Sequence, residues 1–213
     1  MSTVPSDTSE VCKMYASSAS DYAQMMNDEI NLPVYTATFT RLKSNIEGVE
    51  GSIIDTACGS GDMLAMYRTQ YCPDRVLLGF DLSPEMVKFA QKKLGDSAQV
   101  DTGDMRVLSK VESDTAAAVI NFYAIHHICE EDLKVALCEW HRVLKQGGQL
   151  LLAAWEGEGA IDYGEHADIV AIKYSQDQLS VLLQAAGFSV TRSVVELVED
   201  LGLNGVYVDA VKL

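Results

Sequence analysis

The chain has 213 residues, of which 48% are hydrophobic and 22% are charged. This balance is typical of a globular protein and excludes a disordered chain. The formal net charge of −15 argues against binding to a nucleic acid backbone or an anionic membrane, and it favours a neutral or cationic ligand.

No apolar run approaches the roughly 20 residues that a membrane-spanning helix needs. Residues 1–10 are polar and acidic and lack the basic-then-apolar pattern of a secretory signal, so we expect a cytoplasmic protein. The five cysteines include no CxxC pair. This spacing suggests neither a disulfide framework nor a metal site.

The first fifty residues mix polar, aromatic and methionine side chains without a strand pattern. They predict two or three short helices, which we expect to form an N-terminal helical cap over residues 1–50. From residue 51 onward, apolar runs typical of strands alternate with segments of helical periodicity. The strands are predicted at 51–56, 76–81, 99–102, 115–121, 149–155, 190–197 and 206–212. The helices are predicted at 62–70, 83–94, 130–144 and 175–186.

Short apolar strands that alternate with helices predict an α/β fold with a mainly parallel sheet and helices on both faces. Only residues 198–205, with the expected turn at 202–205, separate the last two strands. That is too short for a crossover helix, so these two strands should pair antiparallel. We expect one domain over residues 1–213, with a Rossmann-like core at 51–213 that contains a seven-stranded sheet with an antiparallel C-terminal strand.

A turn of small residues, Asp55-Thr56-Ala57-Cys58-Gly59-Ser60-Gly61, follows the first strand. Open α/β sheets bind nucleotides at this position. A dinucleotide loop would place its third glycine at Asp62. That side chain is too large for close packing, and its negative charge would repel a diphosphate. The sequence therefore disfavours NAD and FAD.

The D-x-A-x-G-x-G spacing instead resembles the first motif of class I S-adenosylmethionine-dependent methyltransferases. Further segments over residues 12–213 resemble the same family. Asp81 ends the second strand, where the family places an acid on the ribose hydroxyls, and a carboxylate suits that task because it accepts two hydrogen bonds. Gly103-Asp104-Met105 matches the adenine segment, and 121–127 matches the segment beneath the methionine part. The 144–148 segment and the stretch from Tyr15 to Tyr22, which resembles a cap over the cofactor, also fit.

The resemblance implies S-adenosyl-L-methionine as cofactor and S-adenosyl-L-homocysteine as product. The residues it implies for cofactor binding are Tyr15, Tyr22, Asp55, Ala57, Cys58, Gly59, Gly61, Asp81, Leu82, Met86, Gly103, Asp104, Met105, Asn121, Phe122 and Tyr123.

Three residues are candidates for catalysis. His126 and His127 follow the fourth strand, at the edge where the methyl donor should lie, and imidazole takes up a proton near neutral pH. The alternative is that both rings pack against the next helix. Tyr22 could close over the cofactor or contact the acceptor. In the glycine-rich segment 155–165, Trp155 and Tyr163 with nearby carboxylates could hold a cationic amine.

The expected function is methyl transfer to an N, O or S atom of a small-molecule acceptor, neutral or cationic, by a monomer or homodimer that uses no metal. Three alternatives remain open. The chain could transfer or cyclise the aminopropyl or aminobutyrate part of the same cofactor. It could be a non-catalytic relative that binds the cofactor. It could also be an NAD-dependent oxidoreductase, which Asp62 disfavours.

Overall fold

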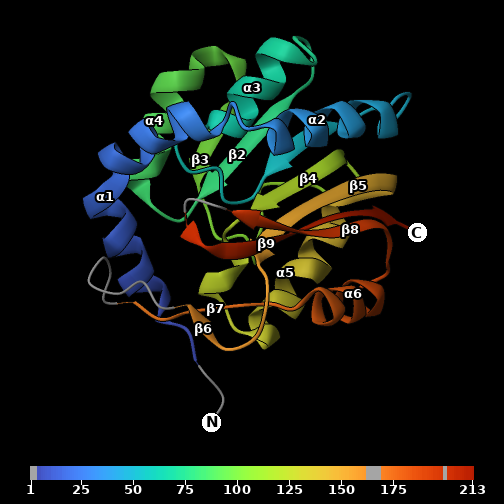
Figure 1. Ribbon diagram of the computed structural model, residues 1–213. Helices are drawn as coiled ribbons and strands as arrows, with labels where there is room; N and C mark the ends of the chain where they lie inside the picture. The colour runs from blue at the N-terminus through green and yellow to red at the C-terminus, as the bar shows by residue number, and fades with distance from the viewer. Residues whose placement is uncertain (1–3, 162–168, 199–200) are drawn as a thin grey trace.

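The computed structural model of the chain describes residues 4–161, 169–198 and 201–213. Its centre is a seven-stranded sheet in the order β3-β2-β1-β4-β5-β9-β8 (Figure 1). Strands β1 to β5 pair in parallel, whereas β9 runs antiparallel to both β5 and β8. The predicted fold class is therefore confirmed. The strands are β1 Ser52–Asp55, β2 Leu77–Asp81, β3 Gln99–Thr102, β4 Ala116–Phe122, β5 Leu144–Trp155, β8 Phe188–Val198 and β9 Leu203–Lys212.

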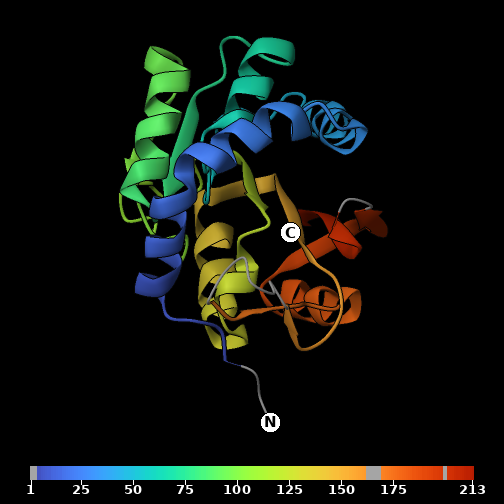
Figure 2. The same ribbon diagram turned by 60° about the vertical axis from the view of Figure 1, so that its left-hand side comes forward.

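Helices cover both faces of this sheet (Figure 2). Because side chains alternate across a strand, neighbouring residues such as Ile53 and Ile54 enter two different cores. One core packs the sheet against α2, α3 and α4, and the other packs it against α5 and α6. The helices are α1 Thr8–Glu29, α2 Pro33–Asn45, α3 Asp62–Gln70, α4 Pro84–Leu94, α5 Glu130–Val143 and α6 Gln176–Ala185.

Four short elements complete the described structure. The 3-10 helices η1 Gly95–Ser97 and η2 Ile125–His127 follow α4 and β4. Strands β6 Ala160–Ile161 and β7 Ala171–Ile172 form a separate antiparallel pair. The sequence analysis did not predict this pair, because two residues are too few to show a periodic pattern.

The N-terminal region differs from the prediction of two or three short helices, since α1 alone is 22 residues long. Asp7 starts it with a capping box, in which its side chain accepts from Ser9 and Glu10 N–H while the Glu10 side chain accepts from Asp7 N–H. No glycine or proline interrupts the segment before Glu29. Figure 1 shows α1 beside the edge at which the parallel strands end.

Helices α3 and α4 approach each other closely at Gly61. This residue has a φ of +85° and caps the N-terminus of α3. A Cβ atom there would lie 3.1 Å from the Cα of Ala90 and 3.0 Å from a methyl group of Leu94. Glycine is therefore required at this position for two reasons: its backbone is left-handed, and a side chain would clash with α4.

We predict that Gly61→Ala lowers the free energy of unfolding by about 2–4 kcal/mol, because it adds overpacking to the left-handed penalty. The control is Gly48→Ala, where φ is +77° but nothing lies within 4 Å. It should cost only the backbone penalty, about 1–2 kcal/mol. Urea denaturation of both variants measures the difference. Equal losses would show that the contact between α3 and α4 accepts an extra methyl group.

Candidate functional site

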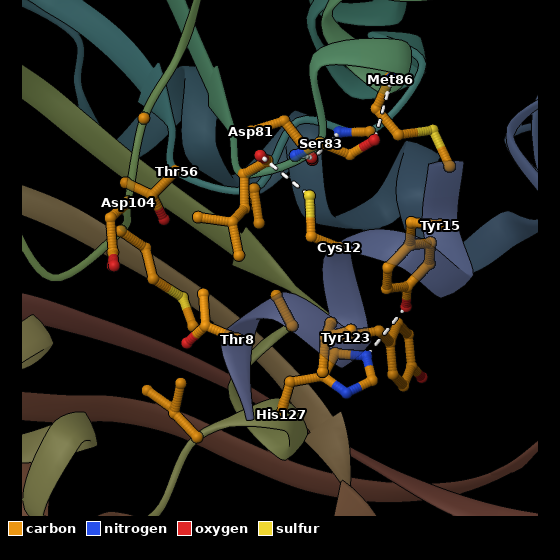
Figure 3. Close-up of a pocket in the computed structure, with 18 of the residues that line it drawn as sticks. Thr8, Cys12, Tyr15, Thr56, Asp81, Ser83, Met86, Asp104, Tyr123 and His127 are labelled. Atoms are coloured by element: carbon orange, nitrogen blue, oxygen red, sulfur yellow. Dashed lines mark hydrogen bonds between the residues drawn. The ribbon is translucent and has the colours of Figure 1, made fainter. Parts of the chain in front are cut away.

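A cavity opens at the carboxyl ends of β1 to β4, beneath α1 (Figure 3). It holds about 780 Å³ of space including its open mouth. We call it the first cavity. It is lined by Thr8, Val11, Cys12, Tyr15, Tyr22, Thr56, Ala57, Gly59, Asp81, Leu82, Ser83, Met86, Gly103, Asp104, Met105, Arg106, Phe122, Tyr123, Ala124, His127 and Ile128.

Asp81 joins two of the loops that form this cavity. Its carboxylate accepts the N–H of Gly59 at 2.8 Å and the N–H of Ser83 at 2.9 Å. Burial raises the pKa of Asp81, and the two backbone donors oppose that rise. The last residue of β2 thus fixes the turn after β1 while its carboxylate still lines the cavity.

The same turn is unsuited to a diphosphate. The N–H of Gly59 already donates to Asp81. Asp62 occupies the first turn of α3, where it is buried, accepts a hydrogen bond from Ser60 and pairs with Lys93 of α4. A buried carboxylate at this helix terminus replaces the anion that a dinucleotide would place there.

Asp104 is held by Arg106, which the sequence analysis did not single out. The guanidinium donates to both carboxylate oxygens of Asp104 and also to Asp132 of α5. Burial would raise the pKa of Asp104, but the hydrogen bonds and charge of Arg106 outweigh it and lower that pKa. Asp104 is therefore a fixed carboxylate at the cavity wall.

One face of α1 closes the first cavity. Thr8, Cys12 and Tyr15 lie on it (Figure 3), and Tyr22 continues the helical spacing. The hydroxyl of Tyr15 makes a 3.0 Å hydrogen bond with Nε2 of His127. Tyr22 lies against the glycine turn, because a Cβ at Gly59 would lie 3.1 Å from its ring.

A larger cavity adjoins the first and shares Tyr15, Tyr22, Ala57, Phe122 and Tyr123 with it. This second cavity holds about 2160 Å³ including open solvent. Its remaining described lining comes from the α1–α2 corner, the glycine turn, the end of β5 and the β8–β9 hairpin: Met25, Met26, Asp28, Glu29, Leu32, Pro33, Val34, Tyr35, Asp55, Cys58, Ser60, Asp62, Met63, His126, Trp155, Glu196, Leu197, Val198, Leu201 and Tyr207.

Asp55 lies at the floor of the second cavity and is 2% exposed. Burial raises its pKa to about 7, opposed by a hydrogen bond from the N–H of Ala57 and reinforced by the nearby Asp81. Asp55 is thus a carboxyl whose charge depends on pH near neutrality. A cation beside it would favour the ionised form.

The two candidate histidines line different cavities. His127 lines the first and His126 lines the second. Burial lowers the pKa of His127 to about 4 and lowers the pKa of His126 well below its usual value. Both rings are therefore neutral at physiological pH, and Nδ1 of each is buried without a hydrogen-bond partner.

Most residues predicted to bind a cofactor line the first cavity, and Asp55 and Cys58 line only the second. Gly61 and Asn121 line neither. Gly61 is taken up by the cap of α3 and its contact with α4. Asn121 is fully buried and donates to Thr56 Oγ1 and Met105 Sδ. Both residues shape the cavity through their neighbours, and their direct contact with the cofactor stays a prediction.

Thr8, Val11, Cys12 and Arg106 also line the first cavity, although the sequence analysis did not select them. The i, i+3, i+4, i+7 spacing of Thr8, Val11, Cys12 and Tyr15 carries the signal that could have identified the first three. Of the two aromatic residues predicted to hold an amine, Trp155 lines the second cavity. Tyr163 lies outside the described residues.

The described residues lack both a metal-binding cluster and a membrane-spanning helix. They contain no group of three or more His, Cys, Asp or Glu side chains placed to hold a metal ion. None of the helices that they form has both the length and the apolar character needed to cross a membrane.

Residues 53–148 match the family model described as a methyltransferase domain. An uncharacterized methyltransferase from Bacillus cereus (strain 03BB102) is 24% identical over 123 residues, which are 56% of this chain and 56% of that protein. The match thus spans about half the length of this curated relative.

Two solved structures share the fold. Magnesium protoporphyrin IX methyltransferase from Synechocystis PCC 6803 with bound S-adenosylmethionine superposes with a TM-score of 0.74 and 16% identity, covering 100% of both chains. Burkholderia thailandensis 1,6-didemethyltoxoflavin-N1-methyltransferase, with its substrate and S-adenosylhomocysteine bound, gives a TM-score of 0.68 and 19% identity, covering 100% of this chain and 93% of that one.

The cofactor of the matched family is S-adenosylmethionine. The family match includes the glycine turn, Asp81 and Asp104, all of which border the first cavity. Residues 53–148 therefore form a methyltransferase domain, and the chain has the fold of S-adenosylmethionine-dependent methyltransferases.

Proposed function

We propose that the protein transfers a methyl group from S-adenosylmethionine to an N, O or S atom of a small molecule. The observation that carries the proposal is the pair of joined cavities at the carboxyl edge of the sheet. The first has the family's cofactor residues in its walls, and the second is large enough for an acceptor.

The charges of the first cavity fit this cofactor, whose sulfonium and ammonium groups are cations. Asp81 is placed to accept hydrogen bonds from the ribose hydroxyls, while its other contacts keep the turn fixed. Asp104 and Met105 line the wall expected to face the adenine. Asp55, next to the turn, would pair with the ammonium group of the methionine part.

S-adenosylmethionine supplies a methyl group that the sulfonium has already activated. The chain's own task is to align the acceptor with that group and to exclude water. Tyr22, Phe122 and Tyr123 border both cavities and would orient the acceptor at their junction. His126 and His127 are the candidate proton acceptors for an acceptor that must lose a proton, although burial lowers the pKa of both rings and so weakens them as bases.

We further propose that α1 and α2 form the cap of a single domain and that the protein is a cytoplasmic monomer or homodimer. The five free cysteines support a reducing compartment.

Product analysis separates this proposal from its alternatives. Methyl transfer yields S-adenosylhomocysteine and an acceptor heavier by one methylene unit. Transfer of the aminopropyl or aminobutyrate part yields methylthioadenosine instead. Absence of S-adenosylmethionine binding in calorimetry would contradict the enzymatic proposal, and a thermal shift with NAD alone would favour an oxidoreductase.

We predict that Asp81→Ala weakens S-adenosylhomocysteine binding by about 1.5–3 kcal/mol, because charge-assisted hydrogen bonds to the ribose are lost. Calorimetry measures the affinity. The matched control is Asp101→Ala, which removes an exposed carboxylate of β3 that pairs with Lys110. That variant should leave the affinity unchanged.

Asp81→Ala also removes the contact with Gly59. A second ligand without ribose hydroxyls is therefore needed to distinguish loss of ribose recognition from disorder of the loop. Binding of the 2′,3′-dideoxy analogue should be weak in the wild type and hardly weaker in the variant. If the variant loses affinity equally for both ligands, Asp81 acts on the loop and the ribose assignment is wrong.

We predict that affinity for S-adenosylmethionine rises as the pH increases through about 7, the folded pKa of Asp55. Below that pH the carboxyl is protonated and cannot pair with the ammonium group. Binding should therefore release protons near pH 6.5, which calorimetry in buffers of different ionisation enthalpy detects. Asp55→Asn should bind more weakly at pH 8 and lose the pH dependence.

The same carboxyl predicts the pH dependence of stability without ligand. Its folded pKa of about 7 lies above the ordinary value of 3.8. The folded state therefore binds the proton more tightly, so the contribution of Asp55 to stability declines as the pH rises from about 4 to about 7. The difference in unfolding free energy between wild type and Asp55→Asn should change over this window. A constant difference would contradict the raised pKa.

A further inference from the structure

The charges around the second cavity all have one sign. Among the described residues that line it are the carboxylates Asp28, Glu29, Asp55, Asp62 and Glu196, and no lysine or arginine. Lys93 neutralises Asp62, and Arg192 approaches Glu196 only to 3.8 Å. Both of these cations lie outside the lining. An anionic acceptor would find no positive partner among these residues.

Aromatic rings form a continuous wall of the same cavity. The rings of Tyr123 and Trp155 have centroids 4.5 Å apart, and Tyr207 lies edge-on to Tyr123 at 6.1 Å. Phe122 continues the wall toward Tyr35, with 6.1 Å between the two centroids. Faces of tyrosine and tryptophan attract cations through their π electrons.

Tyr123 is fixed at the centre of this wall. Its hydroxyl donates to the hydroxyl of Tyr207 at 2.6 Å, so these two polar ends satisfy one another. A Cβ on Gly205 would lie 2.5 Å from the Tyr123 hydroxyl, so only glycine leaves room for it. The backbone of Tyr123 has a φ of +51°, which is strained for a tyrosine. Strain of this kind persists where the surroundings fix a residue, often at functional sites.

His126 adds a buried, neutral ring to the lining. It is 3% exposed, and its Nδ1 has no hydrogen-bond partner. A neutral imidazole has one N–H donor and one nitrogen with a free lone pair. Because burial keeps the ring uncharged, it offers no positive charge to an anionic acceptor.

We propose that the second cavity binds an amine with an apolar or aromatic body and that nitrogen is the atom methylated. This inference rests on the proposed function and specifies its acceptor. The lone pair of the unprotonated amine forms the new N–C bond as the S–C bond breaks, and the electron pair of that bond stays on sulfur. The positive charge moves from sulfur to nitrogen, where the aromatic wall and the carboxylates stabilise it.

The test uses three probes of one size with S-adenosylhomocysteine present in excess. Phenyltrimethylammonium mimics the methylated product, tert-butylbenzene is its neutral isostere, and benzoate is an anion. We expect the cation to bind about tenfold or more tightly than the isostere, and benzoate not to bind. Equal or tighter binding of tert-butylbenzene or benzoate would overturn the proposal.

Variants at the wall test its location. Trp155→Leu should weaken binding of the cation about tenfold and leave that of tert-butylbenzene nearly unchanged, and Trp155→Phe should restore most of the loss. Trp155 does not line the first cavity, so affinity for S-adenosylhomocysteine should stay the same and shows that the variant is folded. The control Phe89→Leu, at a partly exposed ring on α4, should change nothing.

The readouts keep the two proposals apart. Loss of S-adenosylhomocysteine binding in the wild type would defeat the proposed function. Intact binding of that ligand, with cation binding insensitive to Trp155→Leu, would defeat only the amine inference.

Discussion

The site depends on the contact between the carboxylate of Asp81 and the N–H of Gly59. It joins the end of β2 to the turn after β1, and so fixes the two neighbouring loops that border the first cavity. Burying a carboxylate is unfavourable, and two backbone donors offset that cost here. A ligand that brings hydroxyl donors or positive charge adds to this stabilisation, whereas a diphosphate opposes it. Together with the buried Asp62 in the first turn of α3, this contact disfavours a diphosphate at the turn.

The parts of the fold that could be predicted from the sequence are those with local signals. Continuous apolar runs predicted strands such as β4 and β5, and the helix predicted at 83–94 matches α4 almost to the residue. The short separation between β8 and β9 predicted their antiparallel pairing. In each case the local sequence indicates which face of an element is buried or which backbone group is capped. These predictions therefore depend little on contacts with distant parts of the chain.

The rest could not be predicted because it depends on tertiary contacts. Gly61 and Asn121 belong to the motifs of the family, yet α4 packs against the first and the side chains of Thr56 and Met105 enclose the second. Asn121 and Phe122 are neighbours in β4, and their side chains point to opposite faces of the sheet. Only Phe122 therefore lines the cavity. Arg106 was not selected because the sequence does not show that its guanidinium, besides holding Asp104, also reaches Asp132 of α5. Similarly, the second cavity needs α2 beside the β8–β9 hairpin, and the Arg41–Asp209 ion pair links α2 to β9.

The two cavities share one electrostatic design that suits a transferred cation. The guanidinium in the first is already paired with two carboxylates, and the described lining of the second has no lysine or arginine. Both histidines are held neutral by burial. Methyl transfer from sulfur to an uncharged nitrogen moves a positive charge without changing the total. Because both cavities stabilise a cation, the charged side chains of the site need not rearrange during the reaction. An anionic acceptor would instead become neutral on methylation, and the carboxylates of the lining would disfavour its binding before the reaction. For this reason the signs of the lining charges, more than its size or shape, argue for an amine.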